Sequence, residues 1–341
     1  MNQWRLGRLG RGAALALALA GGAGAATVEF GVSYAAGIAG GGGAQVGISG
    51  LEALGGRISA GLSTRAATVG YARGLALPPL GAATVNGTVA LAWRGGVRAD
   101  LRGTATVGPV ALNLGLGAFT TSAASTDPLS VWALTPPDAR DRGLSADLSA
   151  RYRLSRSLIL VAGGELSVQT QGFVGVEGRR DLTRPVPPQE GTGAAASDST
   201  ANDPAEAETT EPETEPVGTL NWRAGVRAGQ GVLGVTAGVG YAAESGLNLG
   251  LDALVGPRTF GITGSVGAPD VLGAGSTLRL YAAYEPWRTS GAPLRTGVEA
   301  TLPVGSGEFG LNLGGGRTGA DTLGYAARVT YRLPLESVSQ P

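Results

Sequence analysis

Charged side chains recur on the polar side of segments in which apolar and polar residues alternate, and they are the residues of this chain that could bind or steer charged groups. The candidates lie on the polar side of the apolar–polar alternation, singly or two or four positions apart, and are Arg98, Asp100, Arg102, Asp147, Arg151, Arg153, Arg223, Arg227, Arg279 and Arg328. Because alternate residues of an extended chain share one face, these guanidinium and carboxylate groups would form rows on one side of strands. Such rows either pair with one another or set the electrostatic field of a water-filled space.

The residue types on which most enzymes depend for nucleophilic attack and proton transfer are missing, because the chain contains no His, no Cys and no Lys. Ser-His and Ser-Lys nucleophiles, imidazole and thiolate metal sites and disulfides are therefore excluded. The carboxylate pairs Glu177 with Asp181 and Asp138 with Asp141 fall in predicted turns or loops, where solvation leaves them ordinary. The Gly40–Gly43 run lacks the Lys-Ser or Lys-Thr of a phosphate loop. We expect no catalytic residue, no metal site, no cofactor and no enzymatic activity, and the net charge of zero gives no indication of nucleic-acid binding.

The elements that would carry these charges are strands with one apolar and one polar face. From Gly143 to Ser155 apolar and polar residues alternate without a fault, and the pattern returns along almost the whole chain. Segments of roughly ten alternating residues separated by Gly or Pro turns are typical of membrane-spanning β-barrels. The firm segments are 26–37, 55–65, 67–77, 82–93, 96–107, 108–119, 143–154, 157–169, 217–228, 230–242, 245–255, 257–267, 275–285, 293–303, 307–316 and 322–334, with 43–50 and 171–180 weaker.

Composition favours the same architecture. Hydrophobic residues make up 43% of the chain, but aromatic residues only 5%, and there are 60 Gly. Small residues suit strands that pack closely and bend, and a lipid-facing surface needs no interlocking large side chains. No apolar run of about eighteen residues follows the N-terminal segment, which argues against a helical membrane protein. A Gly-rich soluble β-solenoid stays open as an alternative, although the chain shows no fixed repeat of the kind such folds have.

The N-terminus, residues 1–25, has the pattern of a cleaved secretory signal peptide. Arg5, Arg8 and Arg11 precede the apolar run Ala13–Ala20, and small residues end at Ala25. A short membrane anchor is the alternative, but the apolar run is far below the roughly twenty residues that a spanning helix requires.

Two long loops interrupt the strands, near 120–142 and near 181–217. The second contains eight carboxylates and no basic residue between Pro185 and Val217, and it is rich in Pro, Thr, Ser and Ala. Such a composition predicts a solvated, disordered loop. The alternative is an acidic segment that gathers divalent cations or repels anions at a pore mouth.

The chain from residue 26 to 335 resembles the bacterial outer-membrane β-barrel proteins, a porin-like class, although no named family can be assigned. The resemblance rests on the signal, the strand periodicity, the tight turns and the final strand Leu323–Leu333, which resembles the closing strand that outer-membrane assembly machinery recognises. It implies an all-β, closed antiparallel transmembrane barrel of about 16 strands, with 14–18 possible, followed by a tail at 336–341. The lipid bilayer and the assembly machinery are then its partners, and the oligomeric state is open.

In such a barrel the polar faces point inward and the aromatic residues Tyr71, Trp93, Trp222, Tyr284 and Trp287 are expected in girdles at the membrane interfaces. Ten arginines would then face the lumen against six carboxylates. The arginines are Arg98, Arg102, Arg151, Arg153, Arg223, Arg227, Arg279, Arg295, Arg328 and Arg332; the carboxylates are Asp100, Asp147, Glu165, Asp252, Glu285 and Glu299.

Two functions follow from that arrangement. A wet lumen predicts a passive pore for small hydrophilic solutes with a weak preference for anions. A lumen filled by ion pairs predicts a structural or adhesive envelope barrel with an occluded interior.

Overall fold

The structure, a computed structural model, describes residues 26–78, 81–138, 140–185, 214–257, 259–288 and 291–335. The expected signal peptide, residues 186–213 of the acidic stretch and the tail 336–341 lie outside the described residues.

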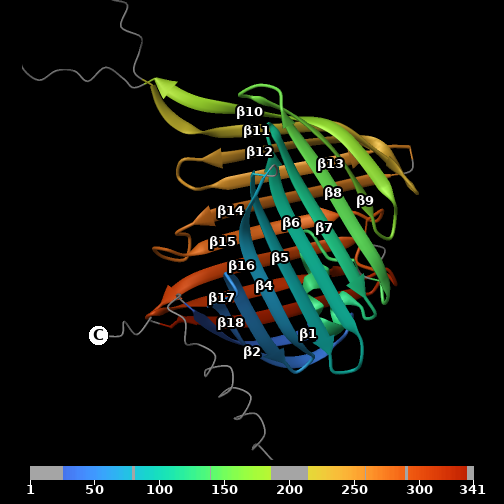
Figure 1. Cartoon of the computed structure of the whole chain (residues 1–341), viewed down its shortest axis with the longest axis vertical. Coiled ribbons are helices and arrows are strands. Elements are labelled where there is room, and N and C mark those ends of the chain that lie inside the picture. The colour runs from blue at the N-terminus through green and yellow to red at the C-terminus, as the bar shows by residue number, and fades with distance from the viewer. Residues whose placement is uncertain are drawn as a thin grey trace, which may run out of the picture.

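Eighteen strands form one sheet (Figure 1). They are β1 (Thr27–Ala36), β2 (Gly41–Ala53), β3 (Gly56–Ser63), β4 (Ala66–Leu77), β5 (Gly81–Ala92), β6 (Val97–Val107), β7 (Val110–Phe119), β8 (Gly143–Arg153), β9 (Leu158–Leu166), β10 (Gln171–Pro185), β11 (Thr214–Gly229), β12 (Val232–Ala243), β13 (Asn248–Val255), β14 (Phe260–Pro269), β15 (Thr277–Tyr284), β16 (Leu294–Val304), β17 (Gly307–Arg317) and β18 (Leu323–Pro334).

The sheet closes on itself. Each strand pairs antiparallel with its neighbour in sequence, and β1 pairs with β18 from Thr27↔Pro334 to Ala36↔Tyr325. The all-β closed antiparallel barrel is therefore confirmed. No edge is left unpaired around the ring, which is the condition for a sheet to lie in lipid.

The strand number, eighteen, is the upper end of the expected range and two above the favoured sixteen. Both weaker segments are strands, β2 and β10, and each carries an irregular register. In β2 the register shifts between Ile48 and Leu51. A bulge breaks the period of two, so the alternation that signals a strand fades at such a point.

The outer face of the barrel is apolar. Val32 in β1 is 59% exposed and Val235 in β12 is 60% exposed, and large hydrophobic side chains at alternate positions of most other strands are exposed in the same way. An exposed apolar surface that surrounds the whole barrel needs a lipid environment.

Because the number of strands is even, the first residue of β1 and the last residue of β18 lie at the same rim of the barrel. The last residue of β10, Pro185, and the first residue of β11, Thr214, lie at that rim too (Figure 1). We call this the termini end and the opposite one the loop end.

The acidic loop is shorter than expected, because β10 and β11 run on as a paired ribbon to Pro185 and Thr214. Arg184 forms an ion pair with Glu215 in this ribbon. The expected boundaries at 181 and 217 are therefore wrong. The residues at these strand ends are polar and show no apolar face in the sequence, but pairing between the two strands keeps them extended.

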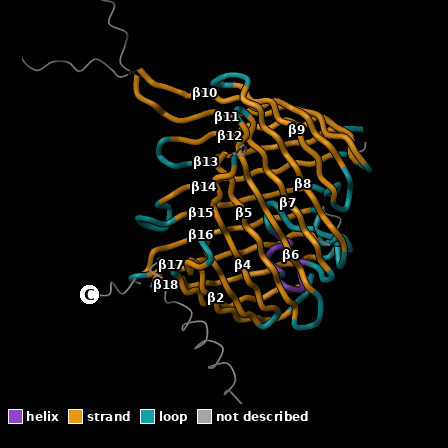
Figure 2. Tube along the Cα trace, in the orientation of Figure 1, coloured by secondary structure: helices purple, strands orange, loops and turns teal. Residues whose placement is uncertain are grey.

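The long connection between β7 and β8 starts at the loop end and contains the helical turns α2 (Ala123–Thr126) and η2 (Pro128–Trp132). Figure 2 shows these turns within the outline of the barrel. In the part of the chain that the structure describes, no helix is long and apolar enough to cross a membrane.

Candidate functional site: the barrel interior

The connection between β7 and β8, residues 120–142, folds into the barrel instead of into solvent. Trp132 is completely buried, and it packs with Ala35 of β1 and Ala326 of β18. A Cβ built on Gly314 of β17 would lie 2.6 Å from the Trp132 Cβ, and one on Gly324 would lie 2.6 Å from its ring. Small residues on the inner wall therefore make the recess that accepts the tryptophan.

Polar contacts hold the same loop against the wall. Arg295 of β16 is 0% exposed and donates to the Ala133 carbonyl at 3.2 Å and the Leu134 carbonyl at 3.4 Å. Its guanidinium also pairs with Glu285 at 2.6 Å. The Tyr281 hydroxyl donates to the Trp132 carbonyl at 3.1 Å. Because the carbonyls of three successive loop residues, 132 to 134, meet buried donors, this part of the loop has a fixed position inside the barrel.

A further anchor joins the loop to β18, where Arg328 forms an ion pair with Asp127. Asp127 also accepts a hydrogen bond from the Leu129 backbone N–H at 3.1 Å and so caps η2. One carboxylate thus orders the helical turn and ties it to the barrel wall.

The connection between β15 and β16 is a second inward segment. Trp287, which the sequence placed in an interfacial girdle, is 9% exposed and packs on Val232 and Leu254 inside the barrel. Its ring also lies against Arg227, with 5.2 Å between the guanidinium carbon and the ring centroid. The girdle expectation is wrong for Trp287, because proximity to a strand end does not tell on which side of the wall a loop folds. Trp93, Trp222 and Tyr284 are exposed as expected.

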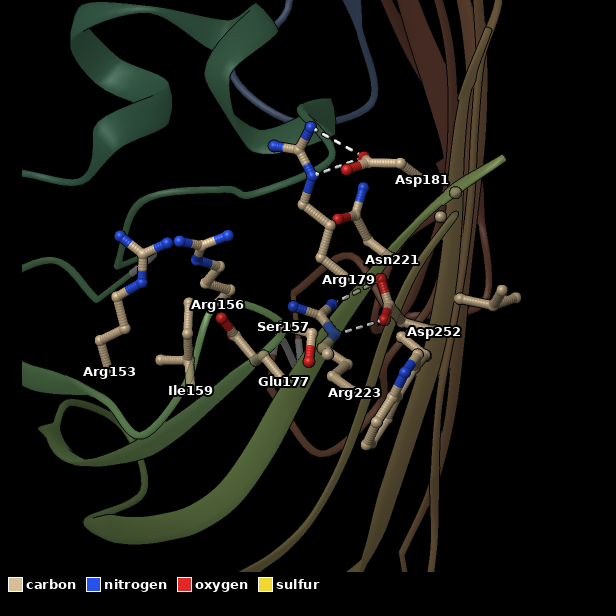
Figure 3. Close-up of a pocket in the computed structure, with 16 residues that line it drawn as sticks. Arg153, Arg156, Ser157, Ile159, Glu177, Arg179, Asp181, Asn221, Arg223 and Asp252 are labelled. Atoms are coloured by element: carbon tan, nitrogen blue, oxygen red, sulfur yellow. Dashed lines mark hydrogen bonds and ion pairs between the residues drawn. The ribbon is translucent and has the colours of Figure 1, made fainter. Parts of the chain in front are cut away.

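Three cavities follow one another through the interior. The first, about 520 Å³, lies at the loop end between Asp138 and β6 to β9, and the second, about 430 Å³, lies beside Leu134 and β8 to β14. The third, about 970 Å³, opens at the termini end around Arg156 (Figure 3). Consecutive cavities share lining residues: Phe173 and Arg227 belong to the first and second, and Glu177, Arg223 and Asp252 to the second and third.

Charged side chains line this series of cavities. The arginines are Arg98, Arg102, Arg140, Arg151, Arg153, Arg156, Arg179, Arg223, Arg227 and Arg288; the carboxylates are Asp100, Asp138, Asp147, Glu165, Glu177, Asp181, Asp252 and Glu285. The lining thus has ten positive groups against eight negative ones, a small excess of positive charge.

Most of these charges are paired. The pairs and their shortest N–O distances are Arg98–Asp100 at 3.3 Å, Arg140–Asp138 at 2.7 Å, Arg151–Glu177 at 3.1 Å, Arg179–Asp181 at 3.0 Å, Arg223–Asp252 at 2.5 Å, Arg227–Glu165 at 3.6 Å and Arg288–Glu285 at 3.9 Å. Among the described residues, Arg102, Arg153 and Arg156 form no ion pair with a carboxylate. One carboxylate of the lining, Asp147, also forms no ion pair among the described residues, so the interior combines a bracing network with three unpaired cations and one unpaired anion.

A glycine lets the Arg223–Asp252 pair form across an intervening strand. Arg223 on β11 reaches Asp252 on β13 over Gly238 of β12, with which both are in register. A Cβ at Gly238 would collide with the Asp252 carboxylate and stand 2.8 Å from the Arg223 Nε. The missing side chain is what permits the two charges to meet.

Eight of the ten residues that the alternation selected line the three cavities, namely Arg98, Asp100, Arg102, Asp147, Arg151, Arg153, Arg223 and Arg227. Arg328 instead lines a smaller cavity of about 290 Å³ beside α2, where it holds Asp127. Arg279 pairs with Glu299 at 3.6 Å on the wall formed by β15 and β16.

The alternation did not single out Asp138, Arg140, Arg156 and Arg288, because these residues lie in connections where no period of two exists. In the loop, Arg140 donates to both carboxylate oxygens of Asp138, and this interaction raises the pKa of Arg140. The charge of Arg140 is therefore fixed at every working pH.

A closed antiparallel sheet with an apolar outer face and a charged, cavity-containing interior defines the class of protein: a transmembrane β-barrel. No protein-family model matches the chain, and no curated protein sequence matches it.

Among solved structures the chain is similar to a triple mutant of the Rhodopseudomonas blastica porin, at 11% sequence identity and a TM-score of 0.42, covering 92% of this chain and 99% of that one. It is also similar to the Pseudomonas aeruginosa proteins OccK11 (OpdR), at 12% identity, a TM-score of 0.45 and coverages of 92% and 96%, and opdK, an outer membrane protein, at 11% identity, a TM-score of 0.43 and coverages of 92% and 98%. Identities and scores of this size transfer no function to this chain.

Proposed function

We propose that the protein is a passive channel of the bacterial outer membrane for small hydrophilic solutes, with a weak preference for anions and no enzymatic activity. The observation that carries this proposal is the series of three cavities, joined by shared lining residues, that extends from the loop end to the termini end. Barrels of this strand number enclose more space than their own wall side chains fill.

The outer membrane is supported by the barrel itself together with the expected signal peptide. Spanning a bilayer with strands requires a closed sheet and an apolar outer band, and the structure has both. Export of the chain rests on the sequence pattern of residues 1–25.

The preference for anions is supported by the small excess of arginine over carboxylate in the cavity lining. Arg102 in the loop-end cavity and Arg153 in the termini-end cavity form no ion pair within the described chain. Unneutralised cations in a water-filled passage raise the local concentration of anions, and the low dielectric constant of the wall strengthens the effect.

A structural or adhesive barrel with an occluded interior is the second candidate. The observation that favours it is the tight packing of residues 123–134, with Trp132 and Arg295 completely buried between loop and wall. In that case the cavities would be separated by side chains that do not move apart.

A planar-bilayer recording of refolded protein separates the two candidates. We expect stepwise conductance increments, and in a salt gradient a reversal potential on the anion-selective side. A barrel that is folded, as judged by heat-modifiable gel mobility, yet inserts without any conductance would support the occluded structure instead.

A further inference from the structure

Two arginines lie where the loop-end cavity meets the middle one. Arg227 of β11 and Arg288 of the connection between β15 and β16 line both cavities, together with Thr135, Ser149 and Phe173. A solute that moves from one cavity to the next must therefore pass these side chains.

Both arginines have weak carboxylate partners. Arg227 is 3.6 Å from Glu165 and Arg288 is 3.9 Å from Glu285, the two longest of the pairs in the passage. Such distances exceed those of a charge-assisted hydrogen bond, so each guanidinium keeps donors that the carboxylate does not satisfy.

The two carboxylates are also engaged elsewhere. Glu165 accepts a hydrogen bond from the Gln171 side-chain amide at 3.2 Å, and Glu285 accepts one from the buried Arg295 at 2.6 Å. Glu285 binds Arg295 through Oε2 and faces Arg288 through Oε1, so its close contact is with Arg295 and not with Arg288. The arginines thus lie in a charged junction whose negative groups are held by other residues.

Aromatic rings fix the position of Arg227. Its guanidinium carbon lies 5.2 Å from the centroid of Phe173 and 5.2 Å from that of Trp287. Two rings on one guanidinium stabilise the cation without neutralising it and leave its edge available to planar oxygen acceptors.

We propose that Arg227 and Arg288 form a discrete transfer site for small oxyanions, of the carboxylate or phosphate type, at the junction of the two cavities. The site rests on the proposed channel function and deepens it. Anion passage would depend on saturable binding at this point, with Phe173 as a positioning residue, and not only on the mean charge of the lumen.

The test uses the full mature barrel in planar bilayers with inorganic phosphate as the probe. We expect the phosphate current of the wild type to saturate with concentration. Arg227→Gln and Arg288→Gln should each raise the half-saturating concentration about tenfold, the loss expected for one charge-assisted hydrogen bond. Arg279→Gln, a lumen arginine outside the three cavities, should leave it unchanged.

Two more variants separate binding from mere charge and from misfolding. Phe173→Leu keeps every charge but releases one face of Arg227, so the half-saturating concentration should rise in the same direction. Arg288→Lys keeps the positive charge and should restore part of the affinity that Arg288→Gln loses.

A wild-type channel that conducts but shows a phosphate current linear in concentration would overturn the site while leaving the channel intact. Absence of any current in the folded wild type would overturn the channel itself. If Arg279→Gln raised the half-saturating concentration as much as Arg227→Gln, the effect would come from the overall charge of the lumen, and the discrete site would be overturned. An unchanged Phe173→Leu variant would remove the positioning role of that ring.

Discussion

At the scale of single residues, arginines of the same strand have different surroundings. Arg98 and Arg102 stand two rows apart on β6, yet Arg98 is 6% exposed and Arg102 is exposed. Arg98 pairs with Asp100, donates to the Asp138 carbonyl at 3.1 Å and lies over the Phe119 ring. Arg98 therefore braces the wall, whereas Arg102 carries a charge that no carboxylate pairs among the described residues.

We predict opposite results for substituting these two arginines by serine. Arg102→Ser should move the reversal potential in a salt gradient toward cations and leave the folded barrel as stable as the wild type, because Arg102 has no carboxylate partner among the described residues. Arg98→Ser should lower the temperature of unfolding, measured by circular dichroism in detergent, because a buried set of contacts is lost. A selectivity that stays the same in Arg102→Ser would argue against the basic lumen.

Arg295 provides a sharper test of bracing. Arg295→Gln should cost about 3–5 kcal/mol of unfolding free energy, since Glu285 is left as a buried charge without its closest partner. The matched control is Arg317→Gln, which breaks an exposed pair with Asp321 at 2.7 Å and should cost less than about 1 kcal/mol. If urea titrations gave the same loss of unfolding free energy for both variants, the buried pair would stabilise the barrel no more than the exposed one.

At the scale of elements, the loop between β7 and β8 decides how much of the lumen is open. Its position depends on a complementary recess of Gly314, Gly324 and Ala326 on β17 and β18, which accepts Trp132. Loop and recess come from segments far apart in sequence, so neither has a fixed shape alone.

We predict that Trp132→Ala releases this loop without unfolding the barrel, because the strand ladder remains complete. The variant should show larger and noisier conductance steps. Because the recess is left empty, the free energy of unfolding should fall by about 3–5 kcal/mol. Trp93→Ala, at an exposed outer position, serves as the control. Conductance identical to the wild type would mean that the loop does not border the passage.

The ribbon of β10 and β11 limits what can be removed from the acidic stretch. Glu215 pairs with Arg184 and belongs to β11, so a deletion should stop before Thr214. We expect removal of residues 191–213 to leave barrel assembly unchanged, because the strands on either side are already paired from Pro185↔Thr214 onward. Loss of heat-modifiable mobility in the deletion variant would show that the stretch braces the barrel.

At the scale of the whole molecule, the contrast between the two faces of the wall determines the environment in which the barrel is stable. Val32 lies on the outer face at the middle of β1, whereas Thr88 of β5 is exposed on the inner face beside Asp100. The same substitution should therefore have different effects on the two sides.

Val32→Arg should destabilise the barrel in lipid by about 2–4 kcal/mol, the cost of arginine on the lipid face near the midplane, whereas Thr88→Arg should cost little. Reversible unfolding from lipid vesicles would measure both values. Equal values would contradict the assignment of the outer face to lipid.

The whole-molecule arrangement also predicts how the protein fractionates. The mature barrel should stay with the outer-membrane fraction after carbonate and high-salt washes and dissolve in detergent. Recovery in the soluble fraction would favour a secreted β-protein.

Sequence alone determined the strands and their faces. A period of two is a local property, so the alternation from Gly143 to Ser155 identified β8 and the side on which its arginines lie. The alternation is weakest at β2 and at the end of β10, where a register shift or a run of polar residues removes the apolar face.

What fills the barrel depends on contacts between segments that are far apart in the sequence. Whether a loop folds inward depends on a recess assembled from distant strands, and the position of Trp132 on Gly314 has no signal in either segment. Which arginines find a carboxylate depends on the register across several strands. Arg223, for example, reaches Asp252 over Gly238 of the strand between them. The faces of a strand follow from neighbours one residue away, but pairing of charges and closure of cavities follow from contacts that exist only after the sheet has closed.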